Sequence, residues 1–384
     1  MTFSLNVNAV TFREHLTSVR DRIQELGGQL TPVIKGNGYG FGRQILAQES
    51  IILGVSRIAV GTVWELEQAL AQFNGQVLVL EPFNASDHLA ISQWQQTTAN
   101  HAHRIIATIA TDNLLDALNV GIRHVVLDGR TSLTRFGLAT HELIHVTQSI
   151  PLDMTVHGLI LHLPIADSPR PSEGGLISGA AGYSEEADGG YSLAGREIET
   201  HAWLLTYREL AREHDLPLHV SLSHMSADEL AQLIKDFPDF SFELRLGTAL
   251  WLGAPSALSV TGQVLAVHNI RKNQHIGYRQ IQSHMNQKLV VVSGGTAHGV
   301  ALAAPSIRSS LRAKSIALVE GINEVRGKVR SPFSKNGHNL LFAEPPHMHV
   351  SLLWCDDDSI AVGDVLTCNM RNTTGQFDVV TGLS

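Results

Sequence analysis

The sequence predicts an α/β protein, with an N-terminal TIM barrel, (β/α)8, followed by a mainly antiparallel β domain. Up to about residue 250, short β-branched runs alternate with helix-like segments, and eight such repeats are typical of a barrel. The runs are apolar throughout, as in strands buried on both faces of a parallel sheet. Beyond residue 255 strand-like runs follow one another and helix signals become sparse. A doubly wound sheet is the structural alternative for the first part.

The expected barrel strands are continuous runs rich in Val, Ile and Leu. They cover residues 29–35, 57–62, 76–81, 104–111, 123–128, 156–162, 218–224 and 242–247. Helix-like segments lie between them, and in the last two of the following four the apolar residues recur at three-to-four spacing: 63–72, 141–148, 198–214 and 226–237. The barrel domain is therefore expected over residues 1–255.

The second domain is expected over residues 256–384. Its strand-like runs are separated by Gly, Asn and Pro, and they cover 259–270, 287–295, 315–320, 349–355 and 361–369. Segment 164–192 interrupts the barrel pattern, because it is rich in Gly, Ser, Pro and acidic residues without periodicity. On a barrel it would emerge at the face where active sites form, so a lid and a surface insert are both open.

Composition narrows the class of protein. The 28 Lys and Arg against 36 Asp and Glu give a net charge of −8, which argues against a nucleic-acid partner. Only two cysteines are present, Cys355 and Cys368, so a disulfide scaffold and a CxxC zinc frame are excluded. No signal peptide and no membrane-spanning apolar run are expected. A cytoplasmic enzyme without a membrane partner is the expectation.

The first candidate site follows the first expected strand, in the sequence Thr-Pro-Val-Ile-Lys-Gly-Asn-Gly-Tyr-Gly-Phe-Gly at 31–42. Burying the ammonium of Lys35 is costly unless it has a use. The alternate glycines allow backbone to approach a phosphate, and the following helix start favours an anion. A desolvated lysine beside a phosphate pocket suits a Schiff base with pyridoxal phosphate. A Gly-rich turn with a solvent-directed lysine is the alternative.

The stretch Pro-Val-Ile-Lys-Gly-Asn-Gly-Tyr-Gly-Phe-Gly resembles the cofactor-lysine motif of the alanine racemase family. These pyridoxal-phosphate enzymes consist of a barrel and a C-terminal β domain, and the resemblance extends along almost the whole chain. It implies that Lys35 forms the Schiff base and that Tyr39 contacts the phosphate.

A second motif, Arg-Leu-Gly-Thr-Ala-Leu-Trp-Leu-Gly-Ala-Pro at 245–255, is similar to the family's Arg-x-Gly-x-x-x-Tyr-Gly-x-x-Pro. It implies that Arg245 faces the pyridine nitrogen and that the N–H groups of Gly247 and Thr248 bind the phosphate. Ser223 matches the family's phosphate serine. Because an arginine keeps its proton, the ring nitrogen stays unprotonated and the cofactor is a weaker electron sink. This favours brief removal and return of a proton.

Tyr278 resembles the tyrosine of the family's C-terminal hairpin, although Arg279 stands where the family has glycine. The resemblance implies that Tyr278 is the second catalytic base and reaches the active site of a partner subunit. Racemisation needs an acid and a base on opposite faces of Cα, which one lysine cannot supply. His162, after the sixth strand, could link Tyr278 to Arg245.

The resemblance also implies which residues bind the substrate. Arg135 resembles the arginine that grips the substrate carboxylate, and Asp128 stands where many members have a modified lysine. Met348 matches the methionine whose backbone lies near that carboxylate, and His349 replaces the family's aspartate. Thr296 replaces a tyrosine that narrows the substrate channel, so an amino acid larger or more polar than alanine is plausible.

The expected function is a pyridoxal-phosphate-dependent amino-acid racemase acting as a homodimer with shared active sites. Two alternatives remain open on the same fold. One is decarboxylation or D-amino-acid aldol cleavage, the latter with a metal at His347 and His349, although two histidines are too few for a closed site. The other is a non-catalytic pyridoxal-phosphate carrier.

Overall fold

The computed structural model describes residues 2–165, 195–302 and 329–383. The chain forms two compact units. The barrel unit comprises Glu14–Gly36 and Arg43–Trp251, and the β unit comprises Met1–Arg13, Asn37–Gly42 and Leu252–Ser384. The units thus differ from the predicted domains 1–255 and 256–384, because the N-terminal segment and most of the Gly-rich segment group with the C-terminal residues.

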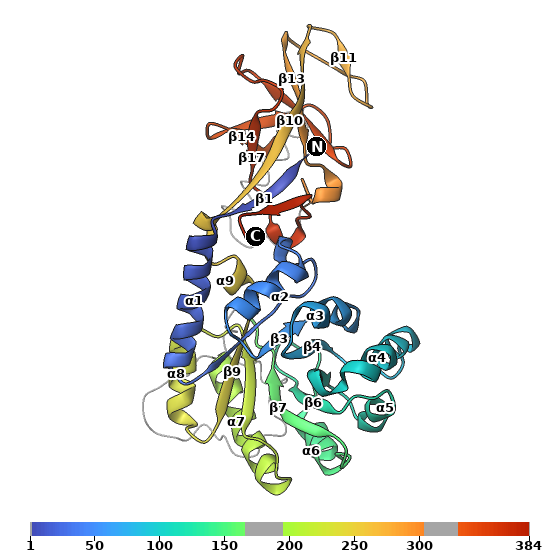
Figure 1. Ribbon diagram of the computed structural model, residues 1–384, viewed down its shortest axis with the longest axis vertical. Coiled ribbons are helices and arrows are strands. Elements are labelled where there is room, and N and C mark those ends of the chain that lie inside the picture. Colours follow the sequence, from blue (N-terminus) through green and yellow to red (C-terminus); the bar gives the residue numbers. More distant parts are fainter. Residues whose placement is uncertain (1, 166–194, 303–328, 384) are drawn as a thin grey trace. The chain divides into compact units, whose positions relative to one another are not determined.

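Eight parallel strands form the barrel sheet in the order β2-β9-β8-β7-β6-β5-β4-β3 (Figure 1). Their bounds are β2 Gln29–Pro32, β3 Arg57–Val60, β4 Gln76–Pro82, β5 Ile105–Ile109, β6 His124–Gly129, β7 Thr155–Leu161, β8 His219–Ser223 and β9 Ser241–Leu246. The sheet closes between its first and last strands, because Val33 bridges Ala59 and the Ile34 N–H donates to the Ala59 carbonyl at 2.8 Å. The predicted TIM barrel is confirmed, and each observed strand overlaps an expected one.

Helices follow the strands and lie outside the barrel sheet (Figure 1). Their bounds are α1 Ala9–Glu25, α2 Arg43–Ile52, α3 Leu66–Gln72, α4 His88–His101, α5 Leu114–Asn119, α6 Thr140–Gln148, α7 Gly195–Glu213, α8 Ala227–Asp236 and α9 Thr248–Trp251. Helix α8 has a capping box, in which the Glu229 N–H donates to Ser226 Oγ at 3.2 Å and the Ser226 N–H donates to Glu229 Oε2 at 2.6 Å. These local signals explain why the segment was predictable.

The barrel interior combines an apolar row with a polar chain. The apolar row takes one buried side chain from each of six neighbouring positions around the sheet: Val33, Ala59, Leu78, Ile106, Val126 and Ile160. Arg57 on β3 and Glu243 on β9 pair at 2.8 Å although their strands are not neighbours, so both side chains lie on the inner face. Interior charges of this kind need partners. The series of polar contacts that supplies these partners extends to the candidate site.

The β unit contains an eight-stranded sheet in the order β13-β16-β15-β14-β17-β10-β1-β18. Its strands are β1 Phe3–Val7, β10 Leu258–Ile270, β13 Gln287–Ser293, β14 Arg330–Lys335, β15 His338–Phe342, β16 Val350–Cys355, β17 Val365–Cys368 and β18 Val379–Thr381. All pairings are antiparallel except that of β1 with β18. A separate hairpin joins β11 His275–Ile276 to β12 Ile281–Gln282. The strand expected at 315–320 lies outside the described residues, as does the expected lid from residue 166 onward.

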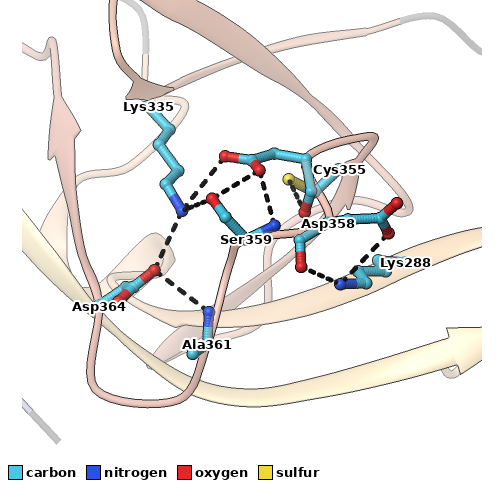
Figure 2. A network of polar contacts seen from close by, with 8 residues as sticks. Lys288, Lys335, Cys355, Asp358, Ser359, Ala361 and Asp364 are labelled. Atoms are coloured by element: carbon cyan, nitrogen blue, oxygen red, sulfur yellow. Dashed lines mark hydrogen bonds and ion pairs between the residues drawn. The ribbon is translucent and has the colours of Figure 1, made fainter.

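A polar network fastens the turn between β16 and β17 (Figure 2). Lys335 Nζ contacts Asp364 at 3.0 Å and Asp357 at 3.3 Å, while Lys288 Nζ donates to the Asp358 carbonyl at 2.7 Å. Hydrogen bonds donated by Ser359 hold the pKa of Asp357 well below its usual range, and the contact with Lys335 adds a smaller effect in the same direction. The network lies at the surface, so it orients the turn more than it stabilises the fold.

The two cysteines are buried and unpaired with each other. Burial raises the pKa of the Cys368 thiol to about 12, so it remains protonated and unreactive at neutral pH. Across the described ranges, no helix is both long and apolar enough to cross a membrane.

Candidate active site

Five predicted site residues lie at or just beyond the carboxyl ends of barrel strands. Lys35 follows β2, Arg245 lies near the end of β9, Ser223 ends β8, His162 follows β7 and Arg135 follows β6. In register, Arg245 lies opposite Thr31 on one side and Ser223 on the other. Because parallel strands end at the same edge of a barrel, all five belong to one face, where active sites of this fold form.

The side chain of Lys35 is open to solvent, in contrast to the buried lysine that the apolar strand suggested. The surrounding barrel mouth nevertheless buries it in part. This partial burial, together with the positive charges of Arg135 and Arg245, lowers the pKa of the Lys35 amine, against an opposing effect of Glu65. A lysine with a lowered pKa and an open path is suited to act as a nucleophile and as a base.

Glu65 is a buried residue of this site that sequence reasoning missed. It ends the 3₁₀ helix η2 (Val63–Glu65), and its two carboxylate oxygens accept the N–H groups of Gly36 at 2.9 Å and Gly61 at 2.7 Å. A Cβ added at Gly61 would lie 3.1 Å from the Cβ of Lys35. Glu65 thus fixes the backbone directly after Lys35 and the strand end beside it.

Arg245 is 3% exposed and has its hydrogen-bond partners inside the barrel. Its Nη1 donates to Ser221 Oγ at 2.8 Å and its Nη2 to the Leu161 carbonyl at 2.9 Å. Ser221 Oγ in turn donates to Glu243 Oε1 at 2.6 Å. Burial lowers the pKa of Arg245 to about 10, so the guanidinium still carries its charge at neutral pH.

His162 is neutral at physiological pH. Partial burial, followed by the charges of Arg245 and Arg135, lowers the pKa of its imidazole to about 3. A hydrogen bond of 3.0 Å joins His162 Nδ1 to Ser223 Oγ. The hydrogen bonds that Arg245 makes inside the barrel go to Ser221 and Leu161 instead, so the link from Arg245 through His162 stays a prediction.

Asp128 lies at the end of β6 and is 8% exposed. Burial raises the pKa of its carboxyl to about 7, although Arg245 and Arg135 oppose this effect. The carboxyl thus lies within the electrostatic reach of both arginines, and its expected role as counter-charge to Arg135 stays a prediction. Arg135 itself is exposed, 5.2 Å from the Phe136 ring, and lines a cavity of about 430 Å³ together with Phe136 and Thr111.

The predicted phosphate-binding backbone begins α9. The Gly247 carbonyl accepts the N–H groups of Leu250 at 3.0 Å and Trp251 at 2.9 Å, so helical hydrogen bonding starts there. The first N–H groups of a helix have no partner within it. Those of Gly247 and Thr248 therefore suit an anion.

Tyr39 belongs to the β unit and lies in the 3₁₀ helix η1 (Gly38–Gly40) with φ of +55°. Its neighbours Gly36, Gly38, Gly40 and Gly42 all have positive φ, which explains their alternate spacing. Within the β unit, a Cβ at Gly40 would lie 2.8 Å from the Asn372 carbonyl oxygen. The glycines are therefore required by the path of the loop.

Tyr278 and Met348 also belong to the β unit, where their side chains are 85% and 66% exposed. The Tyr278 ring lies 4.4 Å from the His347 ring. The other candidate metal ligand, His349, lies against the ring of His298. Within the part of the chain that the structure describes, no three His, Cys, Asp or Glu side chains are arranged to hold a metal ion.

Comparisons with known proteins point to alanine racemases. The family profile "Alanine racemase, N-terminal domain" matches residues 7–176. An alanine racemase from Nostoc sp. is 24% identical over 284 residues, which cover 70% of this chain and 71% of that protein.

Two solved structures illustrate the likeness in fold. Alanine racemase from Bacillus anthracis has a TM-score of 0.63 at 16% identity, covering 98% of this chain and 87% of that one. A histidine racemase from Leuconostoc mesenteroides has a TM-score of 0.61 at 16% identity, covering 95% and 87%. The closed barrel, the lysine that follows its first strand and the β sheet of the second unit define a class of two-domain barrel proteins. Within that class, residues 7–176 match the N-terminal domain of alanine racemases, and the chain is similar in fold to solved alanine racemases.

Proposed function

We propose that this protein is a pyridoxal-phosphate-dependent amino-acid racemase. The observation that carries the proposal is the pairing, at one barrel face, of a lysine whose pKa is lowered with a buried arginine that keeps its charge. A solved relative, alanine racemase from Bartonella henselae, has covalently bound pyridoxal phosphate. It is 18% identical, with a TM-score of 0.60 over 97% of this chain and 91% of that one.

The residues present fit that cofactor. The N–H groups of Gly247 and Thr248 at the start of α9, with the hydroxyls of Ser223 and Tyr39, would hold its phosphate, and His162 would line its ring. Arg245 would face the pyridine nitrogen, and Lys35 would hold the cofactor covalently. When bound, pyridoxal phosphate withdraws electrons from the substrate Cα and so acidifies its proton.

The chain's own residues then carry the proton transfers. The Lys35 amine, because its pKa is lowered, takes or returns the Cα proton on one face of the substrate. Tyr278 does so on the opposite face, supplied by a second copy of the chain in a homodimer. Arg135 binds the substrate carboxylate, with Asp128 as counter-charge and the Met348 backbone beside it.

The substrate class is an α-amino acid, which includes residues larger or more polar than alanine. Thr296 stands where the family has a channel-narrowing tyrosine. One of the similar structures is a histidine racemase, which supports a substrate whose side chain is larger than that of alanine. Decarboxylation, metal-assisted aldol cleavage and cofactor carriage are the outcomes that the test must separate.

The test incubates the cofactor-loaded protein with a panel of L-amino acids in heavy water. NMR follows each Cα–H signal, and chiral chromatography follows the product. Loss of the signal together with the D-enantiomer supports the racemase and names the substrate, and Lys35→Ala should abolish both. Carbon dioxide release, chelator-sensitive aldehyde formation or complete inactivity would instead favour the decarboxylase, the aldolase or the carrier, respectively.

A further inference from the structure

The turn that carries Tyr278 is tightly specified for an exposed segment. Tyr278 lies between the two-residue strands β11 and β12, and hairpins this short have little stability of their own. Gly277 has φ of +68°, and a Cβ there would lie 2.1 Å from Glu344 Oε1. Glycine is therefore required both by the backbone conformation and by the proximity of Glu344.

Glu344 binds the backbone of this turn. It is 4% exposed, and its Oε1 accepts the N–H of Tyr278 at 3.2 Å while its Oε2 accepts the N–H of Arg279 at 3.3 Å. A buried carboxylate is costly unless its oxygens are satisfied, and here two consecutive backbone donors satisfy them. Glu344 thereby fixes the peptide groups that precede and follow Tyr278.

His347 extends this arrangement to the side chain of Tyr278. Its Nε2 lies 2.6 Å from Glu344 Oε1, and its ring packs on the Tyr278 ring with centroids 4.4 Å apart and planes inclined by 35°. An otherwise exposed phenol is thus held by one neighbouring ring, which is itself fixed by the carboxylate that holds the turn.

We infer that Glu344 and His347 are positioning residues for Tyr278, fixing its turn and its ring so that the phenol is presented in one orientation. The inference rests on the proposed role of Tyr278 as second base. It also gives His347 a function other than metal binding, because its Nε2 is engaged by Glu344. A displacement of a catalytic group by about 1 Å can lower the rate about a hundredfold, so fixing the position of Tyr278 would have a large effect on the rate.

The first measurement does not depend on activity. The chain has five tyrosines, so ring-¹³C labelling gives five resolvable signals, and Tyr278→Phe identifies that of Tyr278. In His347→Ala the Tyr278 signal should lose its ring-current shift and become narrow, as for a mobile ring. In Glu344→Gln the amides of residues 278 and 279 should exchange faster. His275→Ala, an exposed histidine in the same hairpin, is the matched control and should change neither.

The second measurement starts Cα–H exchange in heavy water from each enantiomer separately. His347→Ala should slow exchange about tenfold to a hundredfold from the enantiomer whose proton Tyr278 removes, and leave exchange by Lys35 and cofactor affinity close to wild type. His347→Phe keeps the ring contact and should recover part of the rate. An equal loss from both enantiomers would indicate general damage and overturn the inference.

Two further outcomes separate this inference from the proposed function. An unchanged Tyr278 ring signal in His347→Ala, or unchanged exchange of the amides of residues 278 and 279 in Glu344→Gln, would overturn the inference, whatever the activity. If Tyr278→Phe itself exchanges both enantiomers at the wild-type rate, the second base is misassigned and the proposed mechanism fails. The NMR changes would still show that Glu344 and His347 fix the turn and the ring of Tyr278.

Discussion

Asp128 shows how one buried carboxyl makes stability depend on pH. Burial raises its pKa to about 7, above the 3.8 of an ordinary aspartate, against the opposing charges of Arg245 and Arg135. Between these two values the native state binds more protons than the unfolded state, so the free energy of unfolding falls as pH rises through that window.

Replacing Asp128 by Asn should remove this contribution. Relative to wild type, the variant should gain stability as pH rises from 4 to 7, by up to about 4 kcal/mol for a shift of this size. Chemical denaturation of the cofactor-free protein at several pH values measures the difference, and Asp153→Asn, on an exposed turn, is the control. Parallel stability curves for wild type and Asp128→Asn would contradict the raised pKa.

Glu243 is buried but ionised. Burial alone would raise its pKa, but Arg57, His219 and the hydrogen bond from Ser221 together hold it below the usual range. Glu243→Gln would remove the negative charge that lies 2.8 Å from Arg57 inside the barrel, and an uncompensated buried charge typically costs about 3–5 kcal/mol of stability.

The control for that prediction is an exposed pair. Asp112 Oδ2 lies 3.0 Å from His145 Nε2, with side chains 54% and 66% exposed, so Asp112→Asn should change stability by less than about 1 kcal/mol. Thermal denaturation compares the two variants. Equal effects would mean that the interior charges are hydrated in solution.

At the scale of elements, the barrel was predictable because each strand is a continuous apolar run and each is separated by a helical period. The strands missed include two whose partners are distant in sequence. β1 and β18 are short and partly polar, and β1 pairs with β10 more than 250 positions away: Leu5 lies opposite Val260. No local periodicity reports such a pairing.

The pairing of β1 predicts that the N-terminus stabilises the β unit. Leu5 is fully buried, and β1 lies between β10 and β18 in the sheet. Leu5→Ala should therefore destabilise the β unit by about 2–5 kcal/mol. Hydrogen exchange should rise in β10 and β18 and stay unchanged in barrel strands such as β5. The exposed Val10→Ala is the control, and uniform exchange across both units would contradict the assignment.

At the scale of the molecule, sequence reasoning placed the barrel-face residues together but missed those that support them. Lys35, Arg245 and Ser223 follow recognisable strand ends, and the barrel brings those ends to one edge. Glu65 and Glu344 carry no comparable signal, because Glu65 binds the N–H of Gly36, 29 positions away, and Glu344 binds N–H groups 65 and 66 positions away. Such contacts are a property of the fold and cannot be read from spacing.

The proposed sharing of active sites between two chains is testable by complementation. Lys35→Ala and Tyr278→Phe are each expected to be inactive as homodimers. If Tyr278 acts on the partner's site, the heterodimer of these two variants restores one complete site of two. Its activity should therefore be about half that of wild type. Two different affinity tags, purified in succession, isolate the heterodimer for a racemisation assay.

The reciprocal heterodimer makes the result decisive. A chain carrying both substitutions, paired with a wild-type chain, has one substitution in each site if the sites are shared, so it should be inactive. If each chain uses its own Tyr278, the pattern reverses: the wild-type chain keeps its complete site and about half the activity remains. Size-exclusion chromatography must find both preparations dimeric, because a monomer active alone would contradict the shared site directly.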